Sequence, residues 1–155
     1  MIMKRFVYAI ALVATMFFAS SCEETVFEKD GDWDPIELDK THVNFPPEGG
    51  QNTVSALNYS RWWINGGYEV TCIDDQKIKS EYIHASSSDG DETHTYNILD
   101  GGWYHVTVPD KGKNNTNNIS VEPLSSDGNP REAIIEMQAG DAFTKISIAQ
   151  KFGFI

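Results

Sequence analysis

The segment from Trp103 to Gln150 most constrains the fold, because its extended stretches alternate between apolar and polar side chains. In Tyr104–Val108 every second side chain is apolar, and Ala133–Met137 and Thr144–Ile148 repeat the pattern. A period of two is typical of an antiparallel strand with one face against a core and the other in solvent. The sequence therefore predicts an all-β domain.

Further strands are expected before this segment. The cluster Phe45–Gly50 combines two prolines and two glycines, which favour a chain reversal between a strand through Val43 and a strand over Asn52–Leu57. Arg61–Cys72 is a longer candidate strand, in which the adjacent glycines 66 and 67 indicate a bulge or turn. Turn-forming residues recur about every ten residues, which predicts an immunoglobulin-like antiparallel β-sandwich of about seven to nine strands.

The stretch 74–102 supports two interpretations. Ile78–His84 and Thr93–Leu99 fit the two strands of an inserted hairpin with a polar tip, whereas Ile78–Tyr82 also fits a helical turn. Just before this stretch, Cys72 lies at the same strand parity as Val70, which predicts a small buried side chain.

The first 21 residues have the pattern of a secretory signal peptide: two basic residues, the apolar run Phe6–Phe18, and three small residues before Cys22. The apolar run is shorter than a membrane-spanning helix needs. Small residues directly before a cysteine resemble a bacterial lipobox, which implies cleavage before Cys22 and lipid attachment to its thiol. The alternative is a plain signal peptide followed by an incidental cysteine. With a lipid anchor, the domain itself needs no membrane-binding face.

Residues 22–35 are expected to form an acidic tether, and 36–155 the folded domain. Glu23 and Glu24 resemble the export signal that sends Bacteroidetes lipoproteins to the outer face of the outer membrane. The run Asp30–Asp34 has carboxylates at alternating positions, as calcium sites do, but it lacks a complete calcium-loop pattern, so a solvated linker is preferred. The formal net charge of −11 makes nucleic acid an unsuitable partner, because phosphate backbones would be repelled.

Short motifs along residues 38–150 together resemble the BACON domain, whose name abbreviates Bacteroidetes-associated, carbohydrate-binding, often N-terminal. They are Phe45–Gly50, Val54, Trp63-Ile64, Trp103–Val108, Arg131–Ile135 and Ile146–Gln150. The resemblance implies an immunoglobulin-type sandwich of a surface lipoprotein, with carbohydrate binding or an accessory role in polysaccharide handling. The chain departs from the family in the wide separation of Trp63 and Trp103, and the extra residues fall around 74–102.

Four side chains are candidates for glycan binding: Trp62, Trp63, Trp103 and His105. Carbohydrate-binding sandwiches stack exposed aromatic rings on sugars, whereas buried rings supply core packing, and each tryptophan fits either use. Adjacent strand residues face opposite ways, so Trp62 and Trp63 cannot both enter one core. An inward Tyr104 likewise leaves Trp103 and His105 facing the other way.

No catalytic, metal or cofactor site is predicted. The four histidines 42, 84, 94 and 105 lack a second ligand at a zinc-site spacing, and no nucleophile elbow or phosphate-binding glycine loop is present. We therefore expect a non-enzymatic protein with a glycan or an outer-membrane protein as partner. The rival function is a structural spacer or protein-docking domain, which exposed apolar residues on the insertion would favour; a small hydrolase has least support.

Overall fold

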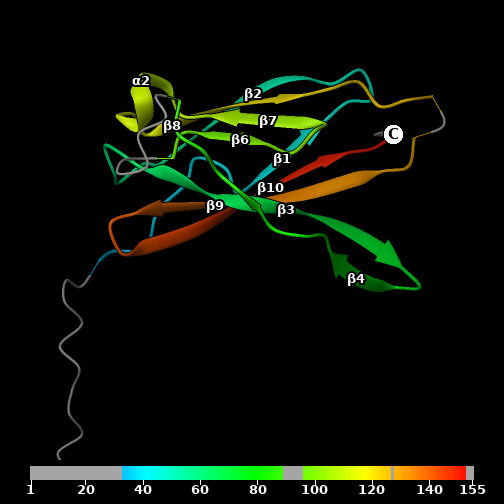
Figure 1. The fold of residues 1–155 in the computed structure, drawn as a ribbon, viewed down its shortest axis with the longest axis horizontal. Helices are drawn as coiled ribbons and strands as arrows, with labels where there is room; N and C mark the ends of the chain where they lie inside the picture. Colours follow the sequence, from blue (N-terminus) through cyan, green and yellow to red (C-terminus); the bar gives the residue numbers. More distant parts are fainter. Residues whose placement is uncertain (1–32, 89–95, 127, 153–155) are drawn as a thin grey trace, which may run out of the picture. The chain divides into compact units, whose positions relative to one another are not determined.

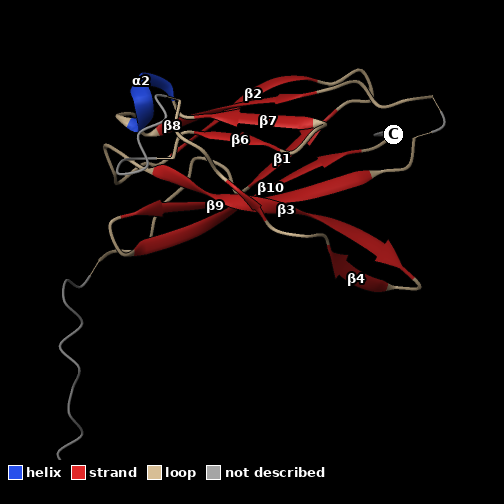
Figure 2. Cartoon of the chain, viewed as in Figure 1, coloured by secondary structure: helices blue, strands red, loops and turns tan. Residues whose placement is uncertain are grey.

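The computed structural model describes residues 33–88, 96–126 and 128–152, which form two β-sheets packed face to face (Figures 1 and 2). The all-β sandwich is thus confirmed, with ten strands in place of the seven to nine expected. They are β1 (His42–Phe45), β2 (Gly50–Ser55), β3 (Trp63–Ile73), β4 (Gln76–Lys79), β5 (Ile83–His84), β6 (Ile98–Asp100), β7 (Tyr104–Thr107), β8 (Thr116–Val121), β9 (Arg131–Ala139) and β10 (Ala142–Gln150).

The larger of the two sheets, called the large sheet here, has the strand order β1-β10-β9-β3-β4, with β5 also paired to β3. The small sheet has the order β2-β8-β7-β6. All neighbouring strands are antiparallel except β1 and β10, which are parallel. The sequence predicted antiparallel strands throughout. It could not identify this parallel pair, because side chains alternate with the same period in parallel and antiparallel strands.

Alternating residues of both sheets meet in one core. Every apolar residue that the alternation places inward on β7, β9 and β10 is buried, and Thr144, at the start of the β10 pattern, is partly buried. Burial of each large aliphatic side chain contributes about 1.5–3 kcal/mol to folding. The inward residues are Tyr104, Val106, Val108, Ala133, Ile135, Met137, Ile146 and Ile148.

The expected reversal at Phe45–Gly50 carries the chain from β1 in the large sheet to β2 in the small sheet. The Gly49 backbone donates a hydrogen bond to the Pro46 carbonyl at 3.0 Å and has a positive φ of 77°. A Cβ at this position would lie 2.2 Å from the carbonyl oxygen of Val121. Only glycine therefore fits this crossing between the sheets.

The region 74–102 differs in part from the expected inserted hairpin: an isolated antiparallel bridge joins Ser86 to Ile98, and residues 89–95 of its expected tip and second strand lie outside the described residues. Asp74 and Asp75 both have positive φ and form a tight turn between β3 and β4, while β6 belongs to the small sheet and pairs with β7. The helical-turn alternative is also wrong, because β4 continues through Lys79. The residues after it return to β3, where the missing Cβ of Gly66 leaves room for the Tyr82 ring.

The β3 strand is irregular and longer than its neighbour. Its register with β9 shifts between Ile64 and Gly66, which confirms the expected bulge near the paired glycines. Pairing with β9 ends at Val70, so the last residues of β3 pair only with β4. Cys72, predicted to be buried, is exposed, because the bulge shifts the alternation and places Cys72 with Tyr68 and Val70 on the side of β3 that points away from the core.

A single helical turn, α2 (Pro109–Gly112), connects β7 to β8. Proline at its first position supplies a fixed φ suited to a helix start. Within the described ranges, no helix has the length and hydropathy required to cross a membrane.

Candidate functional site

The structure separates the four candidate glycan-binding residues. Trp62 precedes β3, is completely buried, and packs in the core, so the expectation that it offers a sugar platform is wrong. Trp63 is only partly buried, as the alternation of neighbouring side chains requires. It lies opposite Gln138 of β9, on the face of the large sheet that points away from the core.

Trp103 lies directly before β7 and packs against the core with part of its ring exposed. The guanidinium of Arg131 lies 4.5 Å from the ring centroid and covers one ring face. Hydrogen bonds from Arg131 to the Gln150 side chain and to the Glu122 carbonyl, both 2.8 Å, hold it there. Burial lowers the pKa of Arg131, and Glu69 and then Glu122 oppose this shift. The covered ring face is therefore not available for stacking on a sugar.

His105 is exposed on β7, as expected from the inward position of Tyr104. The β-sheet register brings it beside Ser120 of β8 and Asp100 of β6. Its Nδ1 lies 3.8 Å from the Asp100 carboxylate. His105 therefore belongs to the face of the small sheet that points away from the core, called the small-sheet face here.

The three strands β2, β8 and β7 supply eight side chains to the small-sheet face. One row across the strands holds Gln51, Ser120 and His105, and the next holds Thr53, Asn118 and Thr107. A third row pairs Ser55 with Thr116, whose hydroxyl groups are 2.8 Å apart. These eight side chains are amides, hydroxyls and one imidazole. On the fourth strand, β6, the register places Asp100 beside His105 and Ile98 beside Thr107 on the same face.

A concavity of about 590 Å³ lies on this face. Five polar side chains in it form no hydrogen bond with any described residue of the chain, so their donors and acceptors are directed at solvent. Each amide offers two donors and an acceptor, and each hydroxyl can donate and accept. These five side chains are Gln51, Thr53, Thr107, Asn118 and Ser120.

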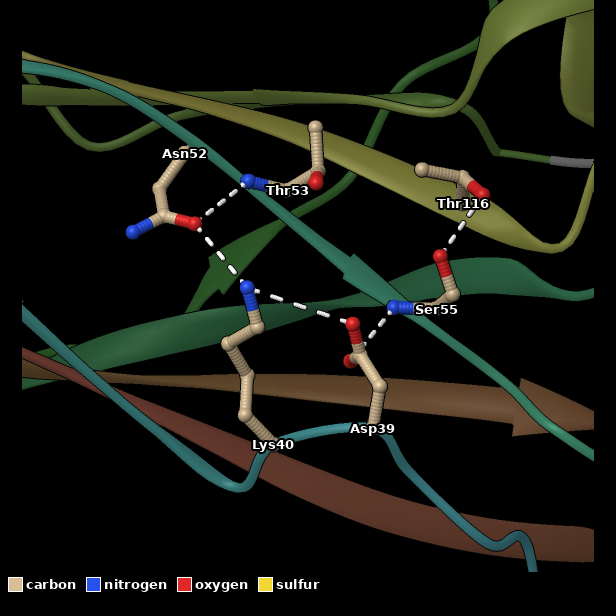
Figure 3. A network of polar contacts seen from close by, with 6 residues as sticks. All are labelled: Asp39, Lys40, Asn52, Thr53, Ser55 and Thr116. Carbon is tan, nitrogen blue, oxygen red and sulfur yellow. Dashed lines mark hydrogen bonds and ion pairs between the residues drawn. The ribbon is translucent and has the colours of Figure 1, made fainter.

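The free edge of β2 is closed by the segment before β1 (Figure 3). Asp39 accepts a hydrogen bond from the Ser55 backbone at 2.9 Å, and Asn52 accepts from the Thr53 backbone at 2.8 Å and from Lys40 at 3.1 Å. Lys40 is also 3.9 Å from the Asp39 carboxylate. Occupied edge groups make β2 a poor template for pairing with another strand, and they fix the border of the concavity.

The outward face of the large sheet, called the large-sheet face here, is organised differently. Glu136 accepts a hydrogen bond from the Tyr82 hydroxyl at 3.0 Å and pairs with Lys145 at 3.0 Å, and Lys145 also reaches the Tyr68 hydroxyl at 3.5 Å. Burial, followed by the hydrogen bond to Glu136, raises the pKa of Tyr82 to about 12. The polar groups of this network bind one another.

A serine, a histidine and a carboxylate also meet on the large-sheet face. The Ser147 hydroxyl donates to Glu132 at 3.2 Å and lies 3.4 Å from Nε2 of His42. In a catalytic triad the imidazole lies between the hydroxyl and the carboxylate and takes the hydroxyl proton. Here the hydroxyl is in the middle and directs its proton to Glu132, so the arrangement is not that of an activated nucleophile.

Among the described residues, no three His, Cys, Asp or Glu side chains converge in a manner that would hold a metal ion. His84 packs edge-on against the Tyr82 ring, with centroids 5.0 Å apart. His94 and most of the Asp30–Asp34 run lie outside the described residues, as does Cys22.

The residues that join His105 in the concavity were not identified by motif. Gln51 and Asn118 come from strands more than sixty positions apart, and only the β2–β8 register brings them together. The available sequence signal was the run of uncharged polar residues at alternate positions of each strand.

No family model matches the chain, and the search of curated proteins gave no match. A solved structure, described as the NMR structure of a protein from Bacteroides thetaiotaomicron, is similar in fold. The two chains share 20% sequence identity and superpose with a TM-score of 0.56, over 83% of this chain and 96% of the other. This similarity supports the β-sandwich fold.

Proposed function

We propose that the chain is a non-catalytic outer-membrane lipoprotein, facing the cell exterior, whose sandwich binds carbohydrate through the small-sheet face. The observation that carries the binding proposal is the set of five polar side chains in the concavity without partners in the described chain. Sugar hydroxyls both donate and accept hydrogen bonds, so side-chain amides and hydroxyls match them. The resemblance to BACON domains is consistent with this function.

The proposed location depends on Cys22 and the acidic residues that follow it. Replacing Cys22 with Ala should release the protein from the membrane fraction, because several acyl chains are needed for durable anchoring. A Cys22→Ala protein that stays in the membrane fraction would contradict lipid attachment.

Affinity electrophoresis tests the binding proposal. Residues 23–155 would be run through gels containing plant, host or microbial polysaccharides, beside Asn118→Ala and His105→Ala. A matched control variant on the opposite face of the sandwich is Trp63→Ala. We expect retardation in at least one gel that the Asn118 variant loses and the Trp63 variant keeps.

Two results would count against this assignment. Loss of retardation in Trp63→Ala alone, with the fold intact, would move the site to the large-sheet face. Absence of retardation in every gel would contradict carbohydrate binding and favour the second candidate function below.

The second candidate is a protein-docking domain, and the β3–β4 hairpin supports it. Ile73 and Ile78 lie on the same side of this hairpin, and their side chains are 53% and 46% exposed. Exposed apolar residues on a projecting hairpin are typical of protein contacts. A photocrosslinking residue in place of Thr71, which lies opposite Ile78 on the same side of the hairpin, should then give one discrete adduct in intact cells, and the double variant Ile73→Ser, Ile78→Ser should abolish it. A lack of any adduct would contradict docking at this hairpin.

A further inference from the structure

We infer that the small-sheet face selects neutral carbohydrate chains over chains that carry carboxylate or sulfate groups. This inference rests on the proposed carbohydrate-binding function and specifies its ligand class. It follows from the charges that line and border the concavity, which differ from those of the chain as a whole.

The chain contains 23 acidic and 12 basic residues, yet the eight outward side chains of β2, β8 and β7 include none of either kind. His105, the one titratable group among them, lies beside the carboxylate of Asp100. Neutral side chains bind a neutral ligand without the cost of removing water from an ion. A hydroxyl-rich, uncharged polymer is therefore the ligand that this lining fits.

An anionic sugar would find no compensating cation at the concavity. Lys40, a cation that bonds to the lining residue Asn52, already lies 3.9 Å from Asp39. Asp100 on the same face and Asp39 beside the edge strand β2 add negative charge instead. The formal charge of −11 adds long-range repulsion that weakens at high ionic strength.

The lining also argues against a protein ligand. Protein interfaces depend on a few central anchors, most often Trp, Tyr or Arg, that fill apolar pockets. The outward side chains of these three strands include no such residue, since their aromatic and aliphatic neighbours point into the core. What remains is two amides, five hydroxyls and one imidazole, with Asn118 between Thr53 and Thr107 in the middle row.

The test compares polymers that share a backbone and differ in charge. The mature full-length protein, purified in detergent, would be run through gels of hydroxyethyl cellulose and carboxymethyl cellulose, arabinoxylan and glucuronoxylan, and fully methyl-esterified polygalacturonate and free polygalacturonate. We expect retention by the neutral member of at least one pair, with binding to its acidic member about tenfold weaker, the factor that ~1.4 kcal/mol produces. Retention by the neutral polymer should not change with added NaCl.

A charge-addition variant supplies the second arm. Thr107→Lys places an ammonium group within the concavity and should raise retention by the acidic polymer at low salt, whereas Phe143→Lys, on the exposed large-sheet face, should not. Equal or stronger retention of the unmodified protein by an acidic polymer would overturn the neutral preference and leave carbohydrate binding intact. Absence of retention by all six polymers would overturn both.

Discussion

The two outward faces of the sandwich use polar residues in opposite ways. On the large-sheet face, Glu136 joins Tyr82 and Lys145 through contacts of 3.0 Å. On the small-sheet face, the side chains of Asn118 and of the four other polar residues named in the concavity form no hydrogen bonds within the described chain. Side chains that bind one another stabilise the fold, whereas side chains directed at solvent remain free to bind a ligand. Mutations on the two faces should therefore affect different measurements.

The largest effect on stability is expected from a substitution in the core, beneath the large-sheet face. Both sheets pack on this core, so its loss should disrupt both faces. Ile146 is fully buried on β10, and Ile146→Asp would leave a carboxylate there without a partner. We expect a loss of about 4–5 kcal/mol or more, comparable with the whole stability of a domain, and hence unfolding by circular dichroism. Phe143→Asp, on the same strand but 64% exposed, is the control and should change stability by about 0.5 kcal/mol or less. A folded Ile146→Asp protein would show that β10 is misplaced.

The next largest effect separates the faces. A Cβ on Gly66 would lie 2.2 Å from the Ile83 carbonyl oxygen and 2.7 Å from the Tyr82 ring, so Gly66→Ala should displace Tyr82 and β5, which pairs with β3 in the large sheet. Overpacking of this kind costs about 1–3 kcal/mol, measurable by urea unfolding. Ser120→Ala on the small-sheet face should leave the midpoint of urea unfolding almost unchanged. Equal stability of Gly66→Ala and the unmodified protein would contradict the close approach of Tyr82.

A direct comparison pairs Glu136→Ala with Asn118→Ala. The first removes the common partner of Tyr82 and Lys145 and should cost about 1–2 kcal/mol of stability, while carbohydrate retention persists. The second should change stability by less than about 0.5 kcal/mol and abolish retention. The contrast between the faces would fail if both variants lost stability equally.

The smallest effect is a change in alkaline stability. Because the folded pKa of Tyr82 is about 12, above the usual 10.0, folding favours its protonated form. That stabilisation is complete below pH 10 and is lost as the pH rises from 10 to 12. Burial also raises the pKa of Tyr104 to about 12, so Tyr82→Phe should reduce the decline in melting temperature over this range without removing it. An unchanged decline would exclude Tyr82 as a contributor.

Sequence periodicity predicted the layers of the sandwich well. The inward positions of Tyr104 and Ile146 follow from alternation alone, because each strand has one apolar side. Alternation also required the side chains of Trp62 and Trp63 to point to opposite sides, but it did not show which of the two enters the core. It failed for Cys72, because the bulge between Ile64 and Gly66 changes which alternate residues of β3 face the core, and Cys72 follows Val70 onto the outward side.

Pairing between distant segments was harder to predict. The stretch 74–102 was expected to fold on itself, yet β4 and β5 pair with β3, β6 pairs with β7, and within the described part of the stretch an isolated bridge joins Ser86 to Ile98. The candidate site depends on such pairings, since its rows combine residues from three strands. His105 was identified because it alternates with a buried tyrosine, whereas Gln51 and Asn118 became candidates only through the register of β2 with β8.

The segment that leads into β1 has a mechanical consequence for a protein held at one end. Leu38 bridges to Ala56 beside β2, and a few residues later β1 pairs in parallel with β10. From Leu38 onward, the chain is therefore bonded first to the small sheet and then to the large sheet. A force along β1 would act in shear on all the hydrogen bonds between β1 and β10 at the same time, instead of breaking them one after another. If the protein is attached at Cys22, the force from a bound polymer would act on bonds to both sheets before any strand separates.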